Sequence, residues 1–116
     1  DKIRKSISVE DTFMKDIVDI NSCELKLKLL YEKLLERCVS ANIKTNHIKE
    51  IFVKIKFNDF EIITRQKKSN NLDLNQFLIL FSENITSVIK PIRLLGLGFK
   101  IKEVSKDTSQ FDIFDR

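Results

Sequence analysis

The spacing of apolar residues switches between a period of two and a period near three and a half, and this pattern constrains the fold most strongly. In "EIFVKIKF" (50–57), apolar residues occupy every second position from Ile51 to Phe57. Such alternation predicts a strand with one buried face, because successive strand side chains point to opposite sides. Ile7 and Val9 alternate with polar residues in the same way within "KIRKSISVEDTF" (2–13). A strand is expected at each run.

Two other segments have the helical period. Apolar residues recur at intervals of three and four from residue 27 to residue 38, and again from residue 77 to residue 89. Each segment is therefore expected to form a helix with one apolar stripe. The residue types that cap helix starts precede both segments: Asn21 with Glu24, and Asp73 with Gln76.

The remaining pattern completes a four-stranded fold. Turn chemistry at Asn58-Asp59 separates the run 50–57 from a second β-rich run, "FEIITRQKK" (60–68), so a hairpin is expected. Pro91 ends the second helix, and "IRLLGLGFKIKEV" (92–104) supplies a last strand. The order β-α-β-β-α-β predicts an α+β fold, with a four-stranded antiparallel or mixed sheet and both helices on one face.

The opposite face of the sheet is then left open, and the alternation predicts which residues lie on it. Lysines, hydroxyls and glycines alternate with the core positions there: Ser6, Ser8, Lys54, Lys56, Gly96 and Gly98. More basic residues are expected just outside the strands: Arg4 and Lys5 before the first, and Arg65, Lys67 and Lys68 beyond the third. Phosphate oxygens accept hydrogen bonds from such groups, and glycine allows close backbone approach. The open face is therefore a candidate binding surface for a nucleic-acid backbone. Phe52 is the lone candidate for stacking on a base, which favours a nucleic-acid duplex over single strands with splayed bases. The alternative is an ordinary solvated sheet face that binds no nucleic acid.

Length and composition limit the other possibilities. The 116 residues suit one domain, expected over residues 1–104, with a flexible tail at 105–116. No apolar run suits a membrane helix and no leader opens the chain, so a cytoplasmic protein without a membrane partner is expected. The only methionine is Met14, so the chain is expected to be part of a longer protein. The net charge of +4 favours an anionic partner only if it is gathered on one face.

The chain offers little for catalysis or metal binding. Cys23 and Cys38 fall in one predicted helix, about 22 Å apart, too far for a disulfide, so both are expected to be free core thiols. His47 is the only histidine and is expected in a surface loop. Glu10 and Asp11 are adjacent acidic residues, but no third carboxylate is expected near them to complete a two-metal catalytic site. The sequence also has no glycine-rich phosphate-binding loop. We therefore expect no catalytic residue, metal, cofactor or small-molecule substrate in this chain.

Three segments resemble, in order and spacing, the signature segments of the little finger domain of Y-family DNA polymerases. They are "RKSISVEDTF" (4–13), "VKIKFNDFEIITR" (53–65) and "IRLLGLGFK" (92–100), and they are closest to the DinB/kappa branch, which includes bacterial DNA polymerase IV. The resemblance implies an accessory domain of an error-prone translesion polymerase, whose sheet holds template–primer duplex mostly without reading bases. The palm domain of the parent enzyme would supply the Mg²⁺ site.

The resemblance and the basic residues near the sheet together give the candidate DNA-binding residues. They are Lys5, Ser6, Ser8, Lys54, Lys56, Thr64, Arg65 and Lys67. The chain departs from the family pattern at two places: Asp11 stands where a basic residue is usual, and Gly98 where arginine is frequent.

The end of the chain resembles the bacterial peptide that binds the sliding clamp, another protein of DNA replication. The five residues concerned are Gln110, Phe111, Asp112, Ile113 and Phe114. Ile113 and Phe114 would fill an apolar pocket of the clamp, with Gln110 hydrogen-bonded beside it. Two alternatives stay open: a tail packed on its own domain, and a protein-interaction module that works mainly through the tail without binding DNA.

Overall fold

The computed structural model describes residues 6–44, 47–85 and 90–102, and it has the element order that the sequence predicts. The strands are β1 (Ser6–Ile17), β2 (Ile48–Phe57), β3 (Ile62–Lys68) and β4 (Ile92–Ile101), and the helices are α1 (Ile20–Ser40) and α2 (Leu74–Asn84). They form one four-stranded sheet in the order β1-β4-β2-β3, with every neighbouring pair antiparallel. The predicted α+β fold is confirmed.

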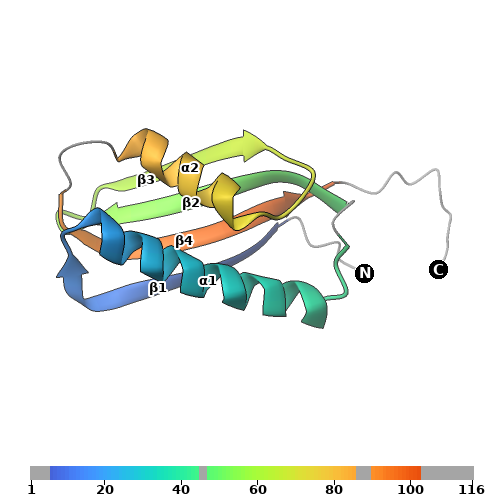
Figure 1. The fold of residues 1–116 in the computed structure, drawn as a ribbon, viewed down its shortest axis with the longest axis horizontal. Helices are drawn as coiled ribbons and strands as arrows, with labels where there is room; N and C mark the ends of the chain where they lie inside the picture. The colour runs from blue at the N-terminus through green and yellow to red at the C-terminus, as the bar shows by residue number, and fades with distance from the viewer. Residues whose placement is uncertain (1–5, 45–46, 86–89, 103–116) are drawn as a thin grey trace, which may run out of the picture.

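Both helices lie on the same side of the sheet (Figure 1), where α1 covers β1 and β4 and α2 covers β2 and β3. The core lies between these layers, and its aromatic centre consists of Phe77, Phe81 and Phe99, each at most 1% exposed. Buried inward positions alternate with more exposed ones along β2 and the first half of β1, as predicted, because only one face of each strand meets the helices. In the central strand β4, residues 94–99 are all buried, and the predicted inward residues Leu95, Leu97 and Phe99 pair with core positions of β2. Among the residues that the structure describes, no helix lies over the other side of the sheet.

The start of α1 differs from the prediction. Asp19 is the N-cap, and its side chain accepts a hydrogen bond of 2.9 Å from the Ser22 backbone N–H. The predicted cap, Asn21, lies inside the first turn of the helix, so that prediction was wrong. Both residue types can cap a helix, and the apolar spacing does not fix a helix start to within two residues.

The end of α1 is closed by hydrogen bonds of the Schellman type. The N–H of Ile43 donates to the carbonyl of Cys38 at 3.0 Å, and the N–H of Asn42 donates to the carbonyl of Val39 at 3.1 Å. Asn42 takes the left-handed backbone conformation, with φ 58°, which this motif requires. The helix therefore ends at Ser40, with Ala41 as its C-cap.

Helix α2 begins at the predicted cap but is shorter than predicted. The Asp73 side chain accepts from the Asn75 N–H at 3.2 Å, whereas the last helical residue is Asn84. The Asn84 side-chain amide donates to the Leu80 carbonyl at 2.8 Å, a bond that binds a carbonyl near the helix end. Ile85 is already extended and is 6% exposed. The last two residues of the predicted stripe, Val88 and Ile89, lie outside the described residues.

The two cysteines are free and buried, as predicted. Cys23 is fully buried, and this burial, with smaller effects from Asp19 and Glu24, raises the pKa of its thiol to about 11. Burial also raises the pKa of the Cys38 thiol. Both thiols therefore stay protonated near neutral pH and behave as apolar core groups.

The hairpin turn between β2 and β3 forms at the predicted residues. The N–H of Phe60 donates to the carbonyl of Phe57 at 2.9 Å, and Asp59 Oδ1 accepts from the Glu61 N–H at 3.0 Å. Lys90, which precedes β4, pairs with the carboxylates of both Asp59 and Glu61. The Glu61 N–H and then Lys90 lower the pKa of the Asp59 carboxyl. This ionic cluster ties the hairpin turn to the segment that enters β4.

Candidate nucleic-acid interface

The side chains that point away from the helices are aligned in four rows across the sheet, because the register pairs outward positions with outward positions. In the strand order β1, β4, β2, β3, the rows are Ser6–Lys100–Glu50–Lys68, Ser8–Gly98–Phe52–Gln66, Glu10–Gly96–Lys54–Thr64 and Thr12–Leu94–Lys56–Ile62. We call these sixteen residues the open face. Figure 1 shows both helices on the other side of the sheet.

Five of the predicted DNA-binding residues lie on the open face. Lys54 and Lys56 are half-buried, whereas the three hydroxyl residues are exposed. The five are Ser6, Ser8, Lys54, Lys56 and Thr64. Lys5 lies outside the described residues.

Arg65 and Lys67 do not belong to the open face, and this corrects the prediction that placed them beyond the third strand. β3 continues to Lys68, and Arg65 and Lys67 pair with core positions of β2. Alternation therefore turns them to the helix side of the sheet, where Arg65 Nε donates to Asn84 Oδ1 at 2.9 Å. That bond holds a cation beside the carboxyl end of α2, where the helix dipole favours positive charge.

Two basic residues of the open face were missing from the predicted site. Lys100 follows Gly96 and Gly98 at the same period of two, so the alternation of β4 could have indicated it. Lys68 could have been found once β3 was known to include it.

The open face also contains a buried apolar residue that the sequence analysis did not place there. Leu94 is only 6% exposed although it points away from the helices.

Acidic residues neutralise part of the positive charge on the open face. Lys54 Nζ lies 3.3 Å from Glu10 Oε1, and Lys100 Nζ lies 3.5 Å from Glu50 Oε1. Lys100 also donates to Gln66 Oε1 at 3.0 Å. Lys54 and Lys100 are thus held over the sheet by side chains of other strands, in two of the three contacts across an intervening strand.

Just beyond the open face, in the turn between β2 and β3, an aromatic residue lies between two cations. Lys56 Nζ and Arg93 Cζ each lie 5.1 Å from the centre of the Phe60 ring. Phe60 has a backbone φ of 69°, which is unusual for a bulky residue, and it is 59% exposed. The ring holds two basic groups at the hairpin end of the sheet by cation–π attraction.

The Phe52 ring lies over Gly98, its partner on the neighbouring strand β4. A Cβ atom at Gly98 would be only 2.3 Å from Phe52 Cζ and 2.7 Å from the carbonyl oxygen of Ile7. The ring therefore fills the place that a side chain at position 98 would need. Phe52 is half-buried and forms the apolar centre of an otherwise polar row.

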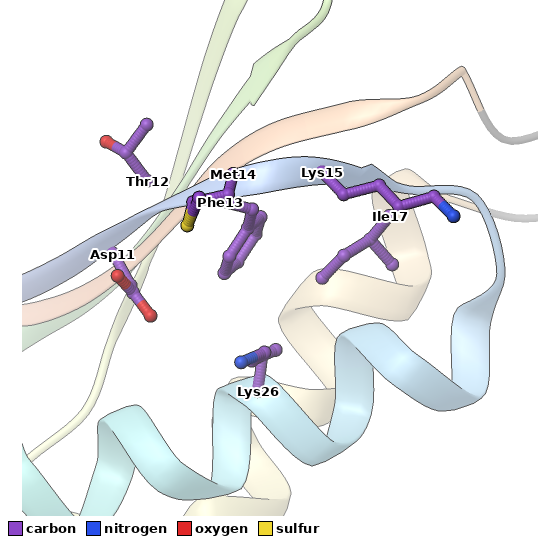
Figure 2. A pocket seen from close by; sticks show the side chains of 7 residues that line it. All are labelled: Asp11, Thr12, Phe13, Met14, Lys15, Ile17 and Lys26. Atoms are coloured by element: carbon purple, nitrogen blue, oxygen red, sulfur yellow. The ribbon is translucent and has the colours of Figure 1, made fainter.

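A hollow on the helix side lies between β1 and α1 (Figure 2). Asp11 and Phe13 point from β1 toward Lys26 of α1, whereas Thr12 points the other way. Lys26 Nζ lies 5.5 Å from the centre of the Phe13 ring. Asp11 therefore lies on the helix side, away from the open face.

The described residues contain no group of three or more His, Cys, Asp or Glu side chains that could hold a metal ion. Within the same residues, neither helix is long and apolar enough to cross a membrane. The predicted clamp-binding residues, Gln110 to Phe114, lie outside the part of the chain that the structure describes.

Comparison with protein families identifies the domain. The model of the impB/mucB/samB family C-terminal domain matches residues 4–113. The chain belongs to this family. The match covers all four strands and both helices, so the family assignment applies to the whole fold and not to one motif.

Curated relatives of this family member include bacterial enzymes named DNA polymerase IV. The chain is 40% identical over 103 residues to DNA polymerase IV of Legionella pneumophila (strain Corby), covering 89% of this chain and 29% of the relative. It is 35% identical over 114 residues to DNA polymerase IV of Pseudomonas entomophila (strain L48), covering 98% of this chain and 32% of the relative. The chain thus spans about a third of the length of these relatives.

Solved structures share the fold of this family member. A complex of the beta-clamp processivity factor with the little finger domain of PolIV matches with a TM-score of 0.76 and 25% identity, covering 86% of this chain and 91% of the other. An insertion ternary complex of Dbh DNA polymerase matches with a TM-score of 0.66 and 12% identity, covering 90% of this chain and 32% of the other. The second match shows a common fold. The predicted resemblance to the Y-family little finger domain is confirmed.

Proposed function

We propose that this domain holds the backbone of a template–primer DNA duplex against its open face, as the accessory domain of a translesion DNA polymerase. The observation that carries the proposal is the uncovered open face with its four lysines, which lie on three adjacent strands: Lys54, Lys56, Lys68 and Lys100. Lysines and hydroxyls bind phosphate oxygens without reading base sequence. The expected result is DNA binding with strong salt dependence and little sequence preference.

The composition of the open face supports a duplex over single strands. Single-strand binders stack successive bases on several aromatic side chains. Phe52 is the one aromatic residue among the sixteen of the open face, and its ring lies over Gly98. The hydroxyls of Ser6, Ser8 and Thr64 add neutral donors beside the lysines.

The rest of the parent protein would perform the chemistry. The relatives named DNA polymerase IV are about three times as long as this chain, which covers 29% of one of them. We propose that the remainder carries the palm domain with the carboxylates that bind Mg²⁺. Two metal ions at such a site stabilise the attacking and leaving oxygens of nucleotide transfer.

The C-terminal tail is proposed to bind the sliding clamp. The motif from Gln110 to Phe114 supports this, and a PolIV little finger domain has been solved in complex with the beta-clamp processivity factor. In this proposal the tail and the open face work together, because one keeps the polymerase on the clamp while the other holds the primed duplex.

Charge reversal on the open face tests the DNA-binding proposal. Binding of the 116-residue chain to a fluorescent primer–template duplex is measured by anisotropy over a range of salt concentrations. Lys54→Glu with Lys56→Glu should weaken binding by at least about tenfold at low salt. The salt slope should fall by about 1 to 2, because Lys54 already pairs with Glu10 in the unchanged chain. Melting temperatures by circular dichroism check that each variant is folded.

The matched control is Lys28→Glu with Lys33→Glu, which makes the same change in net charge at exposed positions of α1. This pair should weaken binding much less, because α1 lies on the other side of the sheet. Equal losses for both pairs would show that the open face is not the DNA-binding site.

A further inference from the structure

The open face carries a carboxylate that faces one of the proposed DNA-binding lysines. Glu10 Oε1 accepts a hydrogen bond from Lys54 Nζ at 3.3 Å. Glu10 belongs to the edge strand β1 and Lys54 to β2, so the pair reaches across the whole width of β4. An anion in this place is unexpected on a surface that binds phosphates.

A glycine makes this long contact possible. Gly96 is the β4 residue between Glu10 and Lys54 in their row. Strands two apart are separated by roughly 9.6 Å, a gap that the two long side chains close by leaning over Gly96. A Cβ atom at Gly96 would lie 3.2 Å from Glu10 Cβ and 3.6 Å from Lys54 Cβ. The ion pair thus lies directly over the residue that has no side chain.

The surroundings of Glu10 differ from those of the other acidic residue on the open face. The Glu50 side chain is only 16% exposed and lies between two lysines of its row, whereas the Glu10 side chain is 53% exposed. Exposed ion pairs contribute little net stability, because water and salt screen them. Glu10 can therefore leave Lys54 at little cost when a stronger anion approaches, while Glu50 is built into the sheet.

We propose that Glu10 lowers the affinity of the open face for DNA by competing with a duplex phosphate for Lys54. This inference rests on the proposed function. A phosphate must displace the Glu10 carboxylate before it can pair with Lys54, and the displaced carboxylate then remains close to a polyanion. Both effects weaken binding, which suits a domain that must move along DNA while the polymerase extends a primer.

Removing the charge of Glu10 tests the inference. Glu10→Gln keeps the size of the side chain and frees the Lys54 ammonium. The variant should bind the primer–template duplex several-fold more tightly at low salt. Its log–log salt dependence should be steeper by about 0.9, because one more lysine becomes free to neutralise a phosphate.

The matched control is Glu83→Gln, which changes the net charge equally at an exposed position of α2, on the helix side of the sheet. It should change affinity and salt slope much less. Equal tightening by both variants would overturn the inference, because net charge alone would then explain the gain. No tightening by Glu10→Gln, in a variant whose melting temperature is unchanged, would also overturn it.

A double-mutant cycle shows whether Glu10 acts through Lys54. On a Lys54→Gln background, Glu10→Gln should lose most of its effect on affinity and slope, because no lysine is left to free. An undiminished gain on that background would overturn the inference and indicate general repulsion instead. The proposed function fails by a different result, namely unchanged DNA binding after charge reversal of Lys54 and Lys56.

Discussion

At the scale of single residues, the two glycines of β4 shape the open face. Gly96 leaves room for the ion pair between Glu10 and Lys54, and Gly98 leaves room for the Phe52 ring. Neither glycine has a positive φ, so backbone conformation is not the reason for either. The reason is space: β4 lies between β1 and β2, and long side chains from these strands, such as Glu10, Lys54 and Phe52, extend over the two glycines.

The two glycines should respond differently to alanine. At Gly98 the new Cβ would meet the Ile7 carbonyl oxygen and Ser8 Cβ at 2.7 Å each, so the backbone must shift. Gly98→Ala should therefore lower the free energy of unfolding by about 1–3 kcal/mol, as overpacking does. Urea denaturation measures the loss.

Gly96→Ala is the matched control for this prediction. Its nearest contacts, at 3.2 Å, are less severe, so the loss of stability should be clearly smaller than for Gly98→Ala. Phe52→Ala together with Gly98→Ala should recover only part of the loss, since the contact with the Ile7 carbonyl remains. Equal stability of the two glycine variants would contradict this account of the sheet.

At the scale of elements, helix ends decide where the helices sit relative to the sheet. The Asp19 cap starts α1 two residues after β1 ends, and the Asn42 turn closes it before β2. α2 starts at its Asp73 cap and ends at Asn84. Because α2 is short, the exposed residues Arg65 and Lys67 on the helix side of β3 can be charged.

Substitution of the two candidate caps of α1 tests which one is used. Asp19→Ala should destabilise the chain by about 1 kcal/mol, because the Ser22 N–H loses its acceptor and the helix dipole loses an anion. Asn21→Ala should change stability little, because Asn21 lies within the helix. Thermal unfolding followed by circular dichroism compares them, and a larger loss for Asn21→Ala would contradict the assignment.

At the scale of the whole molecule, the fold separates a core side, covered by the helices, from the open face. Both helices cover one face, so every apolar stripe is used there and the opposite face is free to carry charge. The chain leaves the sheet at the end of β4, beside the start of β1, and continues toward the predicted clamp-binding residues. The two proposed binding functions should therefore be separable by substitution.

Substitution in the tail tests that separation. Ile113→Ala with Phe114→Ala should reduce clamp binding at least about tenfold, because each side chain would lose an apolar pocket worth roughly 1.5–3 kcal/mol. Binding to the primer–template duplex and the melting temperature should not change. Surface plasmon resonance with immobilised beta clamp measures the first effect.

The open-face variant Lys54→Glu with Lys56→Glu is the reciprocal control, and it should retain clamp binding while losing duplex binding. Unchanged clamp affinity after the tail substitutions would contradict the proposed role of the motif. Loss of both activities in either variant would show that the two functions are not separable.

The sequence predicted the element order, the open face and the inward positions of β2 and β4. These features depend on periodicity, which is local: whether Lys54 or Val53 faces the helices follows from the neighbours of each residue along the chain. The caps were less certain, because Asp19 and Asn21 are both good capping residues only two positions apart. The face of Arg65 was missed because the extent of β3 is set by its pairing with β2.

By itself, the sequence determined which side of β1, β2 and β4 is apolar and thus that two helices leave a lysine-bearing face uncovered. Only the tertiary structure decided which residues meet across strands, such as Glu10 with Lys54 over Gly96, or Phe52 over Gly98. Those contacts join residues 44 or more positions apart, and they depend on strand order and register. Strand order and register are fixed by the packing of the whole sheet against its helices, which no local pattern encodes.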